Sequence, residues 1–99
     1  MAEIIWTETA LQNLDDVAQF IALSSPSAAK NLVDNILKKV ERLANHPESG
    51  RTPEEISEFN YREIVVNPLR IFYSYREDKV FILFVMRQEQ DLRRFILSQ

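Results

Sequence analysis

Two runs of apolar residues between positions 10 and 44 recur with the period of an α-helix. One run comprises Ala10, Leu14, Val17, Ala18 and Ile21, and ends near Leu23. A second run comprises Ala29, Leu32, Val33, Ile36, Leu37, Val40, Leu43 and Ala44. Thr7 and Ser25 precede the runs as candidate N-caps, and Pro26 suits a first helical position. The pattern predicts two amphipathic helices joined as a hairpin.

Leu69–Arg87 has the pattern of a β-hairpin. Its first arm, Leu69–Tyr75, is rich in aromatic and β-branched residues, and its second, Val80–Met86, is seven apolar residues in a row. Four charged residues, Arg76–Lys79, link the arms. The second arm has no polar side, so we predict a central strand covered on both faces by helices, a partner chain or both.

Shorter signals complete the predicted fold. Glu3–Trp6 and Phe59–Val66 are strand candidates, and Gln88–Gln99 could form one short amphipathic helix. Gly50, the single glycine, lies between prolines and is expected to supply a positive φ. The prediction is one α+β domain, residues 1–99: a helix hairpin packed on a small, mainly antiparallel sheet in the order β-α-α-β-β-β, with a short C-terminal helix possible.

Composition excludes several classes of site and partner. Without cysteine, the chain has neither a disulfide framework nor a thiolate metal site. No run approaches the roughly 18 apolar residues of a membrane span, so we expect a cytoplasmic protein with no membrane partner. The net charge of −3 argues against broad binding to nucleic acid. Residues 59–99 nevertheless hold seven bases and five acids, against five bases and ten acids in residues 1–58.

Arginine is the remaining candidate for chemistry. The chain has one histidine, His46, between a helix end and a proline, and no nucleophile set, phosphate loop, metal site or cofactor site is apparent. Five arginines lie in or beside the predicted sheet: Arg51, Arg62, Arg70, Arg76 and Arg87, of which Arg76 is expected to pair with Asp78 across the turn. Their planar charged groups suit two-point recognition of phosphate or carboxylate. The hairpin brings Arg70 and Arg87 together, so both guanidinium groups could meet on one edge. Alternatively, each closes a local ion pair, such as Arg62 with Glu63, while Glu54 and Glu55 are solvated surface charges.

These features together resemble the ParE/RelE superfamily of bacterial type II toxins, and its ParE branch in particular. The matching segments are Trp6-Thr7 with Ala10 and Leu14-Asp15, LANHPESGR (Leu43–Arg51), YREI (Tyr61–Ile64), LRIFYSY (Leu69–Tyr75) and VFILFVMR (Val80–Arg87). Each segment is short, but their order and spacing over nearly the whole chain are fairly specific. The superfamily has the same β-α-α-β-β-β order.

The resemblance implies the toxin of a toxin–antitoxin pair, in a hetero-oligomer with its antitoxin. ParE-like members poison DNA gyrase and block replication, whereas RelE-like members cut messenger RNA on the ribosome. In both, a small antitoxin lays an extended or helical segment over an apolar surface of the toxin. We expect that surface on the apolar strand, at Val80, Ile82, Phe84 and Met86.

The residues favour the gyrase branch. Cutting RNA without a metal requires a base for the 2′-hydroxyl, an acid for the leaving oxygen and cations for the phosphorane. Arg70 and Arg87 match two basic positions of RelE-like nucleases, but no tyrosine, histidine or lysine follows Arg87, and Met86 stands where relatives often have histidine. We therefore expect no catalytic residue and target contacts at Arg51, Arg62, Arg70 and Arg87. The alternatives are an mRNA endonuclease using Arg70 and Arg87, and a non-toxic member that only binds a partner.

Overall fold

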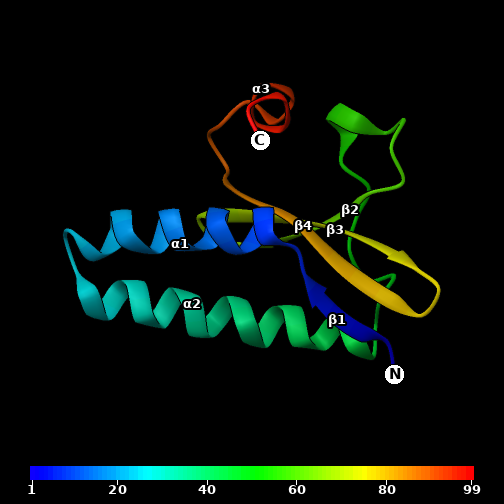
Figure 1. The fold of residues 1–99 in the computed structure, drawn as a ribbon, viewed down its shortest axis with the longest axis horizontal. Helices are drawn as coiled ribbons and strands as arrows, with labels where there is room; N and C mark the ends of the chain where they lie inside the picture. Colours follow the sequence, from blue (N-terminus) through cyan, green and yellow to red (C-terminus); the bar gives the residue numbers. More distant parts are fainter.

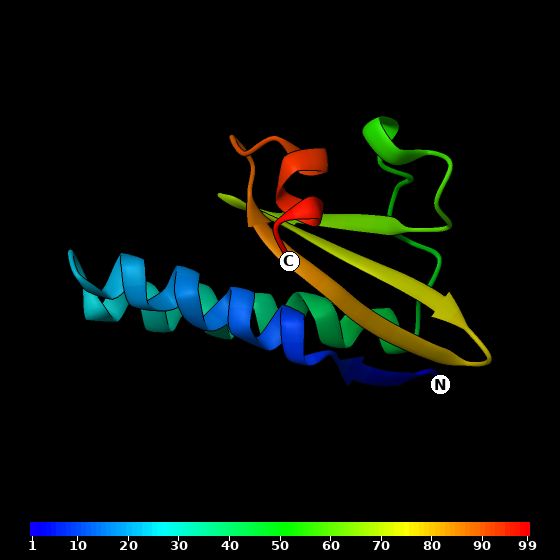
Figure 2. The ribbon, with the colours of Figure 1, turned by 45° about the horizontal axis from the view of Figure 1, so that its top comes forward.

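The computed structural model, which describes residues 1–99, is a four-stranded sheet with a helix hairpin on one face and a short helix on the other (Figures 1 and 2). The elements in order are β1 (Glu3–Trp6), α1 (Glu8–Ala22), α2 (Pro26–Glu41), β2 (Arg62–Val66), β3 (Leu69–Arg76), β4 (Lys79–Arg87) and α3 (Leu92–Leu97), with 3-10 turns at Arg42–Ala44 and Glu54–Ile56. The predicted α+β class and element order are confirmed. No helix is long and apolar enough to cross a membrane.

The helix hairpin begins where its capping residues predict. The Thr7 hydroxyl accepts a hydrogen bond from the Ala10 amide, and the Ser25 hydroxyl accepts one from the Ala28 amide. Pro26 opens α2, where no intrahelical acceptor awaits its missing N–H. The strand predicted at Phe59–Val66 is shorter than expected, since β2 begins at Arg62 and not at Phe59.

The sheet has the strand order β1-β4-β3-β2. β1 runs parallel to β4, and the other two pairings are antiparallel, so the sheet is mainly antiparallel and β4 is an interior strand, as predicted. The predicted four-residue link is wrong, because Arg76 pairs with Lys79 and only Glu77 and Asp78 form the turn. Both have positive φ, 52° and 61°, as a tight hairpin turn of this handedness requires.

A β-bulge divides the β3–β4 pairing into two registers. Tyr73 lies opposite Ile82 but Phe72 lies opposite Phe84, which leaves Leu83 without a partner across the strand. The bulge therefore turns the side chains of β4 that follow it to the opposite face of the sheet.

The two faces carry separate apolar clusters. Val80, Ile82 and Val85 belong to the cluster under α1 and α2, whereas Met86 packs with Phe72, Ile56 and Leu92 on the face under α3. Val80, Ile82 and Met86 are 0% exposed. The four residues predicted to bind an antitoxin therefore do not form one surface: Val80 and Ile82 lie on one face, Phe84 and Met86 lie on the other, and the chain itself buries all of them except the half-buried Phe84.

Gly50 does not have the positive φ that we expected. It is instead a point of close approach: a Cβ atom there would lie 2.5 Å from the Tyr73 hydroxyl and 2.8 Å from the Glu63 carbonyl oxygen. The turn that follows α2 needs glycine for space, and not for backbone freedom.

Candidate functional site

Arg70 and Arg87 lie at the same end of the β3–β4 hairpin but on opposite faces of the sheet. Arg70 is opposite Met86, and Arg87 is opposite Leu69, so they occupy neighbouring cross-strand pairs. The Arg70 guanidinium lies over Phe72 on the α3 face, and that of Arg87 lies over Phe20 of α1. The predicted meeting of the two guanidinium groups is wrong.

Arg70 is held by two carboxylates. Its Nε and Nη2 donate to Glu63 at 3.0 and 2.8 Å, and its Nη1 and Nη2 donate to Glu55 at 2.8 and 3.1 Å. Arg70 is 8% exposed and Glu63 only 2%. The hydrogen bonds that Arg70 donates to Glu63, and next those to Glu55, raise the pKa of Arg70 further above its already high ordinary value. Glu55 is thus an ion-pair partner, unlike Glu54, and Arg70 serves to neutralise a buried glutamate.

The pairing of Glu55 predicts a specific acid sensitivity. The hydrogen bond from Arg70 holds the pKa of Glu55 below its ordinary value of 4.5. A lowered pKa contributes stability that is present above the unfolded pKa and is lost as the pH falls through the folded one. We expect Glu55→Gln to be less stable than wild type at pH 7 and to lose less stability below pH 4.5, as measured by urea midpoints. Glu54→Gln is the matched control, and an equally steep acid limb in Glu55→Gln would contradict the assignment.

Arg62 supports a turn. Its Nη1 donates to the carbonyl oxygens of Glu48 and Gly50 at 3.0 and 2.9 Å, and Glu63 points to the other face, so the expected Arg62–Glu63 pair does not form. The Tyr73 hydroxyl completes the same turn, donating to the Pro47 carbonyl and accepting from the Gly50 amide. Burial raises the pKa of Tyr73, which fits this structural role.

Arg51 is the freest of the four predicted arginines, with 70% of its side chain exposed and a weak 3.4 Å contact to Glu63. It shares a depression of about 430 Å³ with Lys39 and Arg42, at the edge of β2. The sequence did not single out these two residues, because only the fold places the end of α2 beside that edge. We call Lys39, Arg42 and Arg51 the basic edge.

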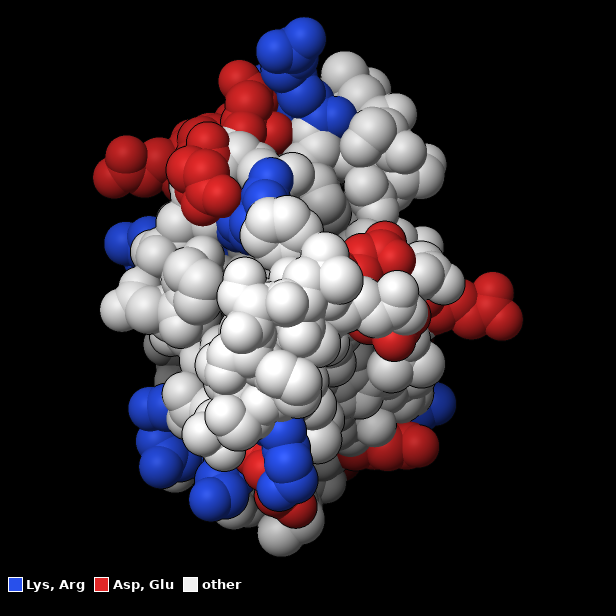
Figure 3. Space-filling view, turned by 90° about the vertical axis from the view of Figure 1, so that its left-hand side faces the viewer, with Lys and Arg blue, Asp and Glu red and all other residues white.

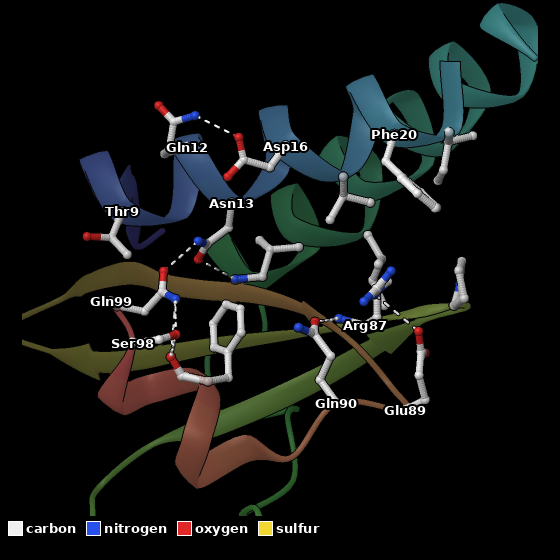
Figure 4. Close-up of a pocket in the computed structure, with 16 residues that line it drawn as sticks. Thr9, Gln12, Asn13, Asp16, Phe20, Arg87, Glu89, Gln90, Ser98 and Gln99 are labelled. Atoms are coloured by element: carbon white, nitrogen blue, oxygen red, sulfur yellow. Dashed lines mark hydrogen bonds and ion pairs between the residues drawn. The ribbon is translucent and has the colours of Figure 1, made fainter. Parts of the chain in front are cut away.

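A larger groove, of about 720 Å³, lies between α1 and α3 (Figure 4). Its apolar lining includes Val17, Phe20, Ile21, Val85 and Phe95. Phe20 is 62% exposed, a large apolar side chain open to solvent. The groove borders the end of the helix hairpin at which α1 connects to α2. No charged residue occurs there from 17 to 29, and Figure 3, which views the molecule from this end, shows uncharged side chains in the middle.

Polar side chains close the floor of this groove. The amide group of Asn13 accepts from the Val85 backbone N–H at 3.2 Å and donates to Gln99 at 2.7 Å (Figure 4). Gln90 accepts from the Arg87 N–H at 2.9 Å, and the Arg87 side chain pairs with Glu89 at 3.1 Å. The predictions from sequence did not include Asn13 or Gln90, because single neutral amides carry no pattern.

Comparison with known proteins identifies the family. Residues 4–92 match the family described as ParE toxin of type II toxin-antitoxin system, parDE. The chain is 38% identical to putative toxin Y4kP of Sinorhizobium fredii, over 88% of each protein, and 32% identical to toxin RelE2 of Caulobacter vibrioides, over 79% of this chain and 84% of that one. A chain of the chromosomal ParDE TA system from P. aeruginosa has the same fold, with a TM-score of 0.74 and 23% identity over 90% of this chain and 98% of its own. This chain therefore belongs to the ParE toxin family of type II toxin–antitoxin systems.

Proposed function

We propose that this toxin inhibits DNA gyrase without cutting any bond, and so blocks replication. The proposal joins the ParE family assignment to one observation, the placement of Arg70 and Arg87. A metal-free nuclease must gather cations and proton-transfer groups around one phosphate. Here the sheet separates the two guanidinium groups, and Arg70 already donates four hydrogen bonds to Glu55 and Glu63.

The basic edge is the surface that we propose for the target. Its three cations line one depression on a protein whose net charge is −3, so they offer a local attraction for an acidic surface. Arg70 and Arg87 are withdrawn as target contacts, because one is buried and the other faces the groove. Arg62 contributes to this surface indirectly, because its hydrogen bond to the Gly50 carbonyl oxygen supports the turn next to Arg51.

An assay of DNA supercoiling with purified gyrase tests this function. Wild-type toxin is expected to inhibit, and the double variant Lys39→Glu/Arg42→Glu to require about tenfold more protein, because reversed charges at an interface repel the same partner. Arg94→Glu, an exposed charge change on α3, is the matched control and should inhibit like wild type. Full supercoiling at a large molar excess of wild-type toxin would refute gyrase as the target.

The 32% identity to a protein named toxin RelE2 favours a second candidate, a ribosome-dependent mRNA endonuclease. It predicts cut messages in cells that express the toxin, detected by primer extension, and their loss in Arg87→Ala. Arg87 is the informative position, because its half-exposed side chain can be removed without unpairing a buried acid. Cut messages together with uninhibited gyrase would replace the first proposal by this one.

The family implies an antitoxin partner, and we propose that the antitoxin occupies the groove between α1 and α3. The groove has an apolar wall that is open to solvent, and it leaves room for a bound segment between α1 and α3. The apolar side chains of β4, by contrast, are already packed against the helices. Phe20 is the proposed anchor. Phe20→Ala is expected to weaken antitoxin binding, since buried aromatic anchors carry much of an interface's binding energy.

A further inference from the structure

The outer edge of β2 is paired at one residue only. β3 pairs with the inner side of β2, and the segment that follows α2 meets the outer side at Arg51, which forms an isolated bridge with Glu63. In this bridge the Arg51 N–H donates to the Glu63 carbonyl at 3.0 Å, and the Glu63 N–H donates to the Arg51 carbonyl at 2.8 Å. The main-chain groups of a strand alternate between its two sides. The N–H and carbonyl of Val65, two residues further on, therefore also point outward.

The chain supplies no main-chain partner for Val65 on this side. If the segment before Arg51 continued along β2, Ser49 would lie opposite Val65. Instead, the Ser49 N–H donates to a carbonyl in the preceding turn, and the Gly50 N–H donates to the Tyr73 hydroxyl at 2.9 Å. The depression of about 430 Å³ lies here, lined by Ser49, Gly50 and Val65, and Val65 is 39% exposed. An open strand edge of this kind is a template for another strand.

The basic edge places cations on both faces of the open position. Lys39 and Arg42 line the depression from the end of α2, on the face of the sheet toward which Ile64 points. Arg51 lies on the opposite face, where its largely exposed guanidinium contacts Glu63. A strand that enters the depression would thus have positive charge on either side of it.

We infer that the toxin binds its target through an extended acidic segment, which pairs with Val65 as an added strand along β2. In an antiparallel pair, the residue opposite Val65 exchanges both main-chain hydrogen bonds with it. The two residues next to that one point toward α2, so carboxylates there would meet Lys39 and Arg42. The inference rests on the proposed function, because it takes the basic edge as the surface that contacts gyrase. It adds the conformation and the charge of the segment that is recognised.

A second copy of this chain is the competing occupant of the edge. Pairing of two β2 edges about Val65 would bring two sets of Lys39, Arg42 and Arg51 to one interface, and like charges across an interface repel. Charged side chains beside an open edge are also a common protection against pairing between edges. The same cations that disfavour a second copy favour a strand that carries acids.

An assay of DNA supercoiling with the full-length toxin and purified gyrase tests the inference. Val65→Pro removes the outward N–H and is expected to raise the amount of toxin needed for inhibition by at least about tenfold. Proline is tolerated on an edge strand where the N–H faces outward, so the variant should remain folded, as urea unfolding would show. Val65→Ala shortens the same side chain but keeps the N–H, and it should raise the amount by only about twofold.

Glu8→Pro is the matched control. It also removes an N–H that has no partner, at the first residue of α1, where proline is well tolerated, and it should inhibit like wild type. If Val65→Pro does not fold, amide hydrogen exchange of the wild-type toxin, measured by mass spectrometry, decides the question. The Val65 N–H should exchange at least about tenfold more slowly when gyrase is bound than in the free toxin, because pairing gives it an acceptor.

Three results would contradict the inference in different ways. Inhibition by Val65→Pro at the wild-type dose, together with weaker inhibition by Lys39→Glu/Arg42→Glu, would overturn strand pairing and leave the basic edge as the target surface. Full supercoiling at a large excess of wild-type toxin would overturn gyrase as the target itself. A wild-type dimer in sedimentation that Val65→Pro dissociates would assign the edge to a second copy.

Discussion

Arg70→Ala is expected to lower the free energy of unfolding by about 3–5 kcal/mol, which is the usual cost of removing one partner of a buried ion pair. The variant leaves the carboxylate of Glu63 without its buried cation. The Glu63 side chain is almost wholly buried and accepts two hydrogen bonds from Arg70. Urea unfolding at pH 7 measures the loss.

The matched control is Arg51→Ala, which removes a weaker contact to the same carboxylate from the solvent side. It should cost at most about 1 kcal/mol, as exposed pairs do. The double variant Arg70→Met/Glu63→Leu should recover much of the loss, because it removes both buried charges together. Equal losses in Arg70→Ala and Arg51→Ala would show that Glu63 does not depend on Arg70.

This prediction affects how a non-toxic Arg70 variant is interpreted. An arginine that matches a basic position of RelE-like nucleases would be substituted first in any search for catalytic residues, and its loss of toxicity would be taken as lost chemistry. In this structure such a loss follows from instability. Arg87 and the basic edge are the positions at which toxicity can be separated from folding.

The fold was largely predictable because its signals are local. Thr7, Ser25 and Pro26 set the starts of the helices, and helical periodicity sets their buried faces. The hairpin turn was misjudged by two residues. Arg76 and Lys79 are charged, which suggested a loop, but they form the exposed last pair of the hairpin, where charge costs nothing.

The two arginines were misplaced for a different reason, a single bulged residue. If the pairing of Tyr73 with Ile82 continued without a bulge, Arg70 would lie opposite Val85, and Arg87 would share its face. The register shift at Leu83 moves Arg87 to the face of α1. Bulges are often marked by glycine, but β4 has none, so the apolar run of Val80–Met86 gave no sign of one.

The groove was also beyond prediction from the sequence, because its parts come from distant segments. Asn13, Val85 and Gln99 meet only after α1, β4 and the end of the chain have packed together. Phe20 lies outside the apolar stripe of its helix, and a single exposed aromatic residue is common on protein surfaces. Its meaning depends on the neighbours that the fold provides.

Gly50→Ala is expected to destabilise the protein by about 2–3 kcal/mol, although glycine-to-alanine changes at ordinary φ often stabilise by about 0.4–1 kcal/mol. The added Cβ would meet the Tyr73 hydroxyl at 2.5 Å, its Cε1 at 2.7 Å and the Glu63 carbonyl oxygen at 2.8 Å. None of these atoms can yield easily. Tyr73 is fully buried, and Glu63 exchanges two backbone hydrogen bonds with Arg51.

A second substitution separates the contacts at Gly50. Tyr73→Phe alone is expected to cost about 1–2 kcal/mol, because the Gly50 N–H and the Pro47 carbonyl lose their shared partner. In the double variant Gly50→Ala/Tyr73→Phe the hydroxyl clash is gone, but the ring and the Glu63 carbonyl still crowd the new methyl group. Its loss should therefore be smaller than the sum of the single losses but larger than that of Tyr73→Phe. Urea unfolding of the wild type, the two single variants and the double variant completes a double-mutant cycle. A neutral or stabilising effect of Gly50→Ala would contradict the prediction, because it would show that the turn can accommodate a methyl group.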